Sequence, residues 1–111
     1  MPDQDSSDDG LRNLVGLDKL IHEPGRLALF AILCGVEKAD FLYLRRQAGL
    51  TAGNLSSHMN KLEAAGYVAV EKRFQGKMPQ TIYELTEDGR RAFEKYRRTI
   101  LEALSRLPEA E

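Results

Sequence analysis

The sequence is poor in cysteine and histidine, and it has no long apolar run. One cysteine in 111 residues excludes an internal disulfide framework and is consistent with the reducing cytoplasm, where we expect the protein to be located. No run of about 18 apolar residues occurs, so we predict no membrane span. The first residues, MPDQDSSDDG, are acidic and polar, which is the opposite of a signal peptide.

Sequence motifs for catalysis and for cofactor binding are also missing. No GxxxxGK[ST] or GxGxxG phosphate-binding loop is present. The single Cys34 and the two histidines, His22 and His58, match no zinc spacing. Neither histidine has a plausible nucleophile motif nearby. We therefore predict that the protein is not an enzyme, has no metal site and requires no cofactor.

Length and composition indicate one globular domain. A chain of 111 residues is long enough for a single modest core. A content of 42% hydrophobic and 30% charged residues argues against wholesale disorder. On composition, we expect residues 1–10 to form a disordered acidic tail and residues 11–107 to form the folded domain.

The rest of the chain is organised around residues 40–70, DFLYLRRQAGLTAGNLSSHMNKLEAAGYVAV. This stretch predicts a short helix, a tight turn, a longer helix and a strand. Asp40 and Thr51 are suited to cap the two helices, because their side-chain oxygens can accept from free N–H groups of the first turn. Gly49 suits the left-handed backbone that ends a helix. The apolar face of the longer helix is predicted to consist of Leu55, Met59 and Leu62.

The outward face of the longer helix is small and polar, with Ser56 and His58 on its flanks. Asn, Ser and Gly are weak helix formers, so this face is better explained by close approach to another surface than by solubility. Two helices joined by a glycine turn are the usual DNA reader. We interpret His58 as either a half-buried packing residue or a phosphate contact. The residues that point outward are Gly53, Asn54, Ser57, Asn60 and Lys61.

The distribution of charge supports this interpretation, although the formal net charge is only −1. Residues 40–80 contain six Lys and Arg against three Asp and Glu, a net charge of +3. Residues 1–39 carry −3 and residues 81–111 carry −1. Positive charge concentrated in one segment is what a contact with phosphates requires, and the alternative is a chance excess of three charges.

The segment before residue 40 predicts two helices. The first covers residues 11–21 and is interrupted or bent at Gly16. The second begins near Pro24, because proline is tolerated in a first turn. Residues 25–36, GRLALFAILCGV, are almost entirely apolar, so this helix should be the most buried element. Cys34 lies within it and is expected to behave as a small buried hydrophobe rather than as a redox or metal residue.

The segment after Gly66 predicts a β-hairpin. Residues 67–72 and 81–85 read as strands, and Gly76 and Pro79 act as breakers in a long tip between them. The tip carries basic and polar residues without an acid between Lys72 and Gln80. An ordinary solvated loop remains the alternative. The candidate contact residues of the tip are Arg73, Gln75 and Lys77.

A long helix over residues 87–107, capped by Thr86, is predicted to end the domain. Its apolar residues recur every three or four positions, close to a heptad seam. Such a stripe outruns a small core, so we expect part of it to pack on a second copy of the chain. The alternative is that the helix folds back on its own domain. The residues of this predicted dimerisation stripe are Phe93, Tyr96, Ile100, Leu104 and Leu107.

The run LTAGNLSSHMNKLEAAGYVAVEKRFQGKMPQTIYELTEDGRRAFEKY resembles winged-helix transcriptional regulators of the broad MarR and ArsR group. It is most similar to a small single-domain branch marked by "GNLSSHL…KLE..GYV…K.F.G..P.T.Y.LT..GR.A", and the likeness covers about residues 17–100. Met59 stands where the pattern usually has leucine, a swap of similar volume. Metal-sensing relatives carry a cysteine pair that this chain lacks, so metal sensing is not implied.

The resemblance implies a mainly α fold with a small β-hairpin: a winged helix-turn-helix with flanking N-terminal and C-terminal helices, the latter for dimerisation. It also implies a homodimer that binds duplex DNA and regulates transcription without a cofactor, and it indicates no particular effector. Residues 51–61 match the recognition helix and residues 73–80 match the wing. The rival hypothesis is a winged-helix module that binds protein through an apolar patch.

Three sets of DNA contacts are expected. The recognition helix should reach base edges with Asn54, Ser56, Ser57 and Asn60, and Gly53 should permit its close approach. Thr51 and His58 also belong to the predicted DNA-binding set. Phosphates should be held by Arg45, Arg46 and Lys61. The wing should contact the backbone or the minor groove through Arg73, Gln75 and Lys77.

Overall fold

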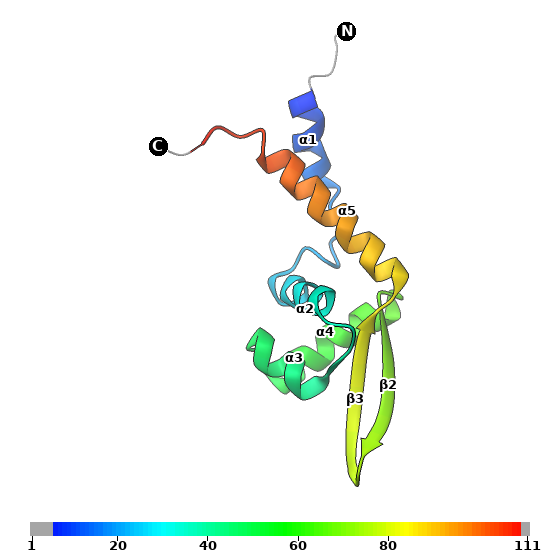
Figure 1. Cartoon of the computed structure of the whole chain (residues 1–111). Helices are drawn as coiled ribbons and strands as arrows, with labels where there is room; N and C mark the ends of the chain where they lie inside the picture. The colour runs from blue at the N-terminus through cyan, green and yellow to red at the C-terminus, as the bar shows by residue number, and fades with distance from the viewer. Residues whose placement is uncertain (1–5, 110–111) are drawn as a thin grey trace.

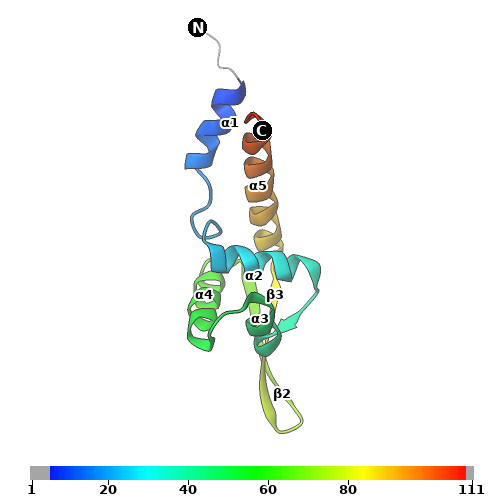
Figure 2. The same cartoon turned by 90° about the vertical axis from the view of Figure 1, so that its left-hand side faces the viewer.

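The computed structural model describes residues 6–109 and has a head, a wing and an arm (Figure 1). The elements are α1 (Ser6–Val15), α2 (Pro24–Gly35), β1 (Ala39–Asp40), α3 (Phe41–Ala48), α4 (Ala52–Ala64), β2 (Val68–Gln75), β3 (Met78–Leu85) and α5 (Glu87–Leu104). The head contains α2, α3 and α4. The wing is the β2–β3 hairpin, and the arm consists of α1 beside the C-terminal half of α5. Arm and wing project in opposite directions from the head (Figure 2). The predicted winged helix-turn-helix fold is thereby confirmed.

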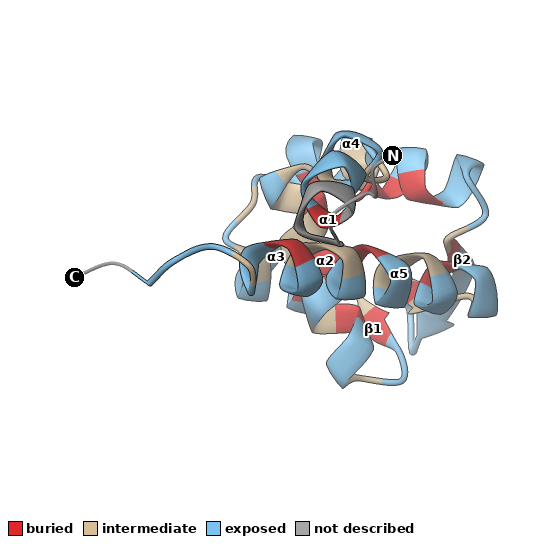
Figure 3. Ribbon diagram, turned by 90° about the horizontal axis from the view of Figure 1, so that it is seen from above, coloured by how far each residue is buried: buried red, intermediate tan, exposed pale blue. Residues whose placement is uncertain are grey.

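The core of the head forms where α2 crosses the helix-turn-helix. Leu29, Phe30 and Leu33 of α2 are fully buried, as is Leu44 of α3. The Phe30 ring stacks on that of Phe93, with centroids 5.3 Å apart and planes at 3°. Through this contact the first half of α5 is fixed to the head. In Figure 3 the helices alternate between buried and exposed residues, as expected for helices with one side on a core.

The predicted helix caps are confirmed. The side chain of Asp40 accepts from the backbone N–H of Tyr43 at 2.7 Å, and Thr51 Oγ1 accepts from Asn54 at 3.1 Å. Thr86 caps α5 in the same way. Gly49 ends α3 with a φ of 68°, a left-handed conformation that glycine adopts without strain.

The wing differs from the prediction of a hairpin with a long tip. The two strands stay paired from Val68↔Leu85 to Gln75↔Met78, so only two residues form the turn. Gly76 has a φ of 65°, as the first central residue of a tight type II′ turn requires. Pro79 does not break β3. Strand β1 pairs only with Ile82 and Tyr83, so that edge of β3 is free at position 79. A proline on a free edge leaves no N–H unpaired.

A third strand, β1, was not predicted. Ala39 and Asp40 pair with Tyr83 and Ile82 of β3, which makes a three-stranded antiparallel sheet of order β1-β3-β2. Two residues are too few to produce a readable alternation. The sequence could therefore reveal the cap at Asp40 but not the strand that includes the same residue.

The N-terminal boundaries also need correction. Helix α1 begins at Ser6, so a disordered tail reaching residue 10 is wrong, and residues 1–5 lie outside the described residues. The helix ends at Val15, and residues 17–23 form turns instead of continuing it. Asp18 stabilises these turns, because its Oδ1 accepts from the backbone N–H of Leu20 at 2.9 Å. The break at Gly16 was thus placed correctly, but the helix does not resume after it.

Cys34 is exposed, which contradicts the prediction that it lies in the core. Its helix is apolar on all sides in sequence, but only one side faces the core. Leu29, Phe30 and Leu33 occupy that side, whereas the small residues Ala31 and Cys34 are left outside. Apolar composition alone could not distinguish the two sides.

Candidate nucleic-acid interface

Helix α4 is held in the head by one apolar face and exposes the other. Leu55 and Leu62 are fully buried, and Met59 is 1% exposed. The outward side chains are therefore fixed in direction by the core. The exposed polar residues on this helix and at its cap are Thr51, Gly53, Asn54, Ser56, Ser57, Asn60 and Lys61.

His58 lies at the side of this face and is engaged within the chain. Its side chain is 15% exposed, and its Nε2 lies 3.8 Å from Glu23 Oε1. Its Nδ1 lies 3.1 Å from Nη1 of the buried Arg26. The backbone N–H of Arg26 donates to Glu23 and lowers the pKa of the Glu23 carboxyl. Of the two interpretations of His58, the half-buried packing residue therefore describes its contacts.

Basic side chains border α4 on the α3 side. Arg45 and Arg46 lie in the last turn of α3, and both are exposed. A positive charge in the last turn also interacts favourably with the helix dipole. Both residues are thus exposed in the helix that immediately precedes α4.

The wing carries the three residues predicted for it, and one of them is partly engaged. Gln75 and Lys77 are exposed at the tip. Arg73 Nε donates to Gln80 Oε1 at 3.4 Å, and Gln80 in turn donates to Asp40 Oδ2 at 3.1 Å. Arg73 Nη1 also lies 3.8 Å from Glu71. These contacts connect the wing to the start of α3, so Arg73 has a structural role in addition to any contact with DNA.

A hollow of about 400 Å³ separates α4 from the wing. It brings together Ser56 and Asn60 of α4 with Lys72 and Thr81 of the wing. Neither wing residue was in the predicted contact set. Both residues lie in segments predicted as strands, and strand alternation from Val70 would have indicated that Lys72 faces α4.

A tyrosine of β3 and a carboxylate of α4 also line this hollow. Tyr83 and Glu63 both line it. Burial, with the Glu63 charge as a smaller effect, raises the pKa of Tyr83. At neutral pH the Tyr83 hydroxyl is protonated and able to donate, as an ordinary tyrosine hydroxyl is.

The predicted dimerisation stripe consists of a part that packs on its own domain and a part that is exposed on the arm. Phe93, Tyr96 and Ile100 pack against the core of the same chain, as the alternative interpretation expected. Leu104 and Leu107 are 51% and 49% exposed, and Leu107 follows the end of α5. Further exposed apolar residues of the arm are Leu11, Val15 and Leu101.

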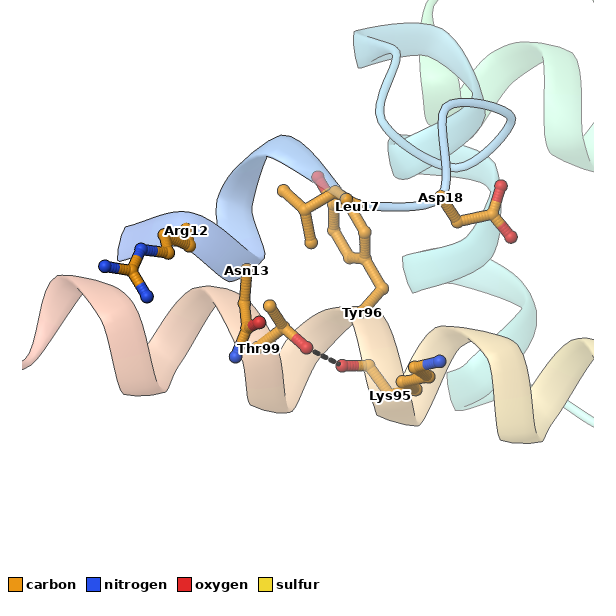
Figure 4. Close-up of a pocket in the computed structure, with 8 residues that line it drawn as sticks. Arg12, Asn13, Leu17, Asp18, Lys95, Tyr96 and Thr99 are labelled. Atoms are coloured by element: carbon orange, nitrogen blue, oxygen red, sulfur yellow. Dashed lines mark hydrogen bonds between the residues drawn. The ribbon is translucent and has the colours of Figure 1, made fainter. Parts of the chain in front are cut away.

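A polar hollow of about 340 Å³ lies where α1 meets α5 (Figure 4). Leu17 lies against the ring of Tyr96 in this view, and the hydroxyl of Thr99 donates to the carbonyl of Lys95 at 2.9 Å. Tyr96 is also fixed from the other side, because its hydroxyl lies 2.8 Å from His22 Nδ1. The hollow is far from α4, on the arm.

Within the part of the chain that the structure describes, two kinds of feature are absent. No helix is long and apolar enough to cross a membrane. No group of three or more His, Cys, Asp or Glu residues is placed to hold a metal ion.

Comparison with known proteins gives consistent results. Residues 26–105 match the family described as winged helix DNA-binding domain. An uncharacterized protein of Methanocaldococcus jannaschii is 37% identical over 84 residues, which cover 76% of this chain and 91% of that protein. A transcriptional regulator homologue from Pyrococcus horikoshii superposes with a TM-score of 0.71 at 28% identity, covering 87% of this chain and 92% of that one.

A third relative shares the fold at lower identity. It is a homodimeric winged helix-turn-helix DNA-binding domain from Mycobacterium bovis, a possible ArsR-family regulator, with 20% identity and a TM-score of 0.65 over the whole of both chains. The family match spans the helix-turn-helix, the wing and α5. The chain therefore belongs to the winged helix DNA-binding domains, a non-enzymatic family, and is similar to transcriptional regulators.

Proposed function

We propose that this protein binds duplex DNA in a sequence-specific manner, as a homodimer, and regulates transcription. The observation that carries the proposal is the polar outer face of α4. It is fixed by three buried residues, Leu55, Met59 and Leu62, and is flanked by the basic wing. The major groove of B-DNA admits an α-helix and presents a distinct pattern of donors and acceptors at each base pair.

The chemistry of the α4 face suits direct contact with bases. Asn54 and Asn60 carry both a donor and an acceptor, as recognition of adenine at N6 and N7 requires. Ser57 can donate or accept. Gly53 meets nothing within 4 Å of a Cβ built on it, so the helix start is free to lie close to the groove.

The surrounding cations suit phosphate contacts, which position a protein on DNA without reading sequence. Arg45 and Arg46 lie on one side of α4, and Lys61 lies in its last turn. Lys77 at the wing tip is exposed and extends the positive surface beyond the head. These groups should make binding depend strongly on salt.

The exposed apolar part of the arm supports the homodimer. Leu101 and Leu104 of α5 and Val15 of α1 are 55%, 51% and 83% exposed. Apolar side chains gathered on one projecting element mark an interaction site. The M. bovis relative is described as homodimeric, and a two-fold axis through the arms would present two copies of α4 to one duplex.

A module that binds protein through α4 is the weaker hypothesis. Such a surface would need bulky apolar side chains on the exposed face, as peptide-binding grooves have. Alanine is the only apolar side chain among the exposed residues of α4. Location in the cytoplasm stays a prediction that follows from the single cysteine.

The proposal is tested by selecting bound sequences from a pool of random duplex DNA with the purified protein. We expect enrichment of one near-palindromic motif, with half-sites about one helical turn, or ~34 Å, apart. Binding without enrichment of any motif would contradict sequence-specific recognition. A motif without internal symmetry would contradict the dimer.

The dimer is tested separately with Leu101→Glu and Leu104→Glu combined. Analytical ultracentrifugation should show dimers for the wild type and monomers for this variant, which should lose specific binding and keep weak nonspecific binding. Lys95→Glu is the matched control, because it also changes the charge by −2 and, at 100° per residue, lies on the opposite side of α5 from Leu104. A wild-type monomer that binds its site tightly would overturn this part of the proposal.

A further inference from the structure

The tip of the wing exposes two large apolar side chains. Phe74 is 72% exposed and Met78 is 69% exposed. Neither belongs to the core or to the partly buried residues packed against it. The fold therefore does not require an aromatic ring at position 74, whose apolar surface remains in water.

The register of the hairpin shows on which side Phe74 lies. Phe74 pairs with Pro79, and Lys72 pairs with Thr81. Side chains two residues apart in a strand lie on the same face of a sheet, so Phe74 shares the face of Lys72. That face borders the hollow lined by Ser56 and Asn60 of α4. Phe74 thus continues the α4 side of the wing toward its tip.

Met78 lies on the opposite face. It pairs with Gln75, and both line a separate hollow together with Asp40 and Leu42 at the start of α3. The two exposed residues are therefore comparable in exposure and position along the wing but face different sides. This makes Met78 a matched control for Phe74.

The charges around Phe74 select the kind of surface that it can meet. Phe74 follows Lys72 and Arg73 and precedes Lys77, and no acid occurs between Lys72 and Gln80. An apolar ring among cations suits a partner with an anionic exterior and an apolar interior, which describes duplex DNA and an anionic membrane alike. The shared face with α4 favours DNA, because a duplex against α4 lies on that side of the wing.

We propose that Phe74 is a wedge that enters the minor groove next to the half-site bound by α4 and partly unstacks one base step. Apolar wedges of this kind kink the duplex toward the major groove. Pyrimidine–purine steps such as TA and CA/TG are the most easily kinked. The wedge therefore contributes specificity for such a step at a position without base-edge hydrogen bonds. This inference rests on the proposed DNA binding.

The test compares Phe74→Ala, Phe74→Leu and Met78→Ala on the selected duplex with dyes at both ends. Resonance energy transfer should report a bend of about 20–90° for the wild type. The bend should be retained in Phe74→Leu and Met78→Ala and largely lost in Phe74→Ala. Affinity should fall roughly tenfold in Phe74→Ala, within the range for loss of one base contact by an aromatic ring. Circular dichroism of each variant checks the fold.

The outcomes separate the wedge from the underlying function. Failure of the wild type to select any DNA would remove the proposed function and the wedge with it. Specific binding with the same bend and the same preferred step in Phe74→Ala would overturn the wedge alone. Sedimentation with vesicles of phosphatidylcholine and phosphatidylglycerol gives the third arm. Vesicle binding that depends on Phe74, with DNA bending that does not, would assign the tip to membranes and overturn the proposal.

Discussion

The guanidinium of Arg26 and the imidazole of His58 join the start of α2 to the recognition helix, with Nη1 and Nδ1 3.1 Å apart. A guanidinium can only donate, so in this hydrogen bond Arg26 Nη1 donates and His58 Nδ1 accepts. Arg26 Nε also donates to the carbonyl of Leu20 at 2.5 Å. A buried cation thus connects the middle of α4 to the start of α2.

Replacement of His58 tests this contact. His58→Leu leaves one N–H of the buried guanidinium without an acceptor, which should lower the free energy of unfolding by about 1–3 kcal/mol. His58→Gln keeps an acceptor and should lose less. Urea denaturation measures both. Equal stability of the two variants would show that the hydrogen bond is unimportant, and a large loss of DNA affinity in a stable His58→Gln would restore its role as a phosphate contact.

Two glycines should respond in opposite ways to alanine. A Cβ on Gly89 would collide with the Tyr67 carbonyl oxygen and lie 3.0 Å from its carbon, so Gly89→Ala should destabilise by about 1–3 kcal/mol. Gly53 has open space, and Gly53→Ala should stabilise α4 by about 0.5–1 kcal/mol. If α4 lies close to the groove, the stabilised variant should nevertheless bind DNA less tightly. Thermal unfolding and a binding titration on each variant check both effects.

The hydroxyl of Tyr67 donates to Asp18 Oδ2 at 2.5 Å and connects the strand after α4 to the turns before α2. This hydrogen bond, with burial as a smaller cause, raises the pKa of Tyr67 to about 12, against about 10 for an unfolded tyrosine. Because the folded state favours the neutral form, the stabilisation is fully present below pH about 10 and is lost as pH rises through about 12.

The stability difference between wild type and Tyr67→Phe should therefore be constant below pH 10 and shrink between pH 10 and 12. Urea denaturation at several pH values measures it. Subtracting the free energy of unfolding of the variant from that of the wild type removes the contribution of other titrating groups. Asp18→Asn should abolish most of the pH dependence that Tyr67 contributes. A difference that does not change up to pH 12 would contradict the contact.

Salt dependence tests the phosphate contacts of the wing. Combined neutralisation in Arg73→Gln and Lys77→Gln should flatten the slope of log K against log salt by up to about 2, since each neutralised phosphate contributes about 0.9. All DNA sequences should be weakened similarly. Lys95→Gln with Arg98→Gln removes the same charge from the arm and should leave the slope unchanged. Equal effects of the two pairs would point to net charge rather than contact.

Local chemistry explains which features could be predicted from sequence. The caps at Asp40, Thr51 and Thr86 and the left-handed Gly49 depend on a few neighbouring residues, and all four were predicted correctly. The buried side of α4 followed from helical spacing, because its two faces differ sharply in polarity.

Features that depend on tertiary partners could not be predicted in this way. Pro79 was interpreted as a breaker, because the sequence does not show that β1 pairs only with Ile82 and Tyr83 and leaves the edge of β3 free at position 79. Cys34 was misplaced since its helix is apolar all round. The engagement of His58 with Arg26 joins residues 32 positions apart, and no local pattern reports such a pair.

The central claim is that the outer face of α4 reads bases, and sequence selection with altered α4 residues tests it most directly. Asn60→Ala and Ser57→Ala should each keep the fold and change the base preferred at one position of each half-site. The expected loss of discrimination there is about 1–3 kcal/mol, with the remaining positions unaffected. If both variants select the same motif as the wild type with unchanged preferences, this face of α4 does not read the sequence.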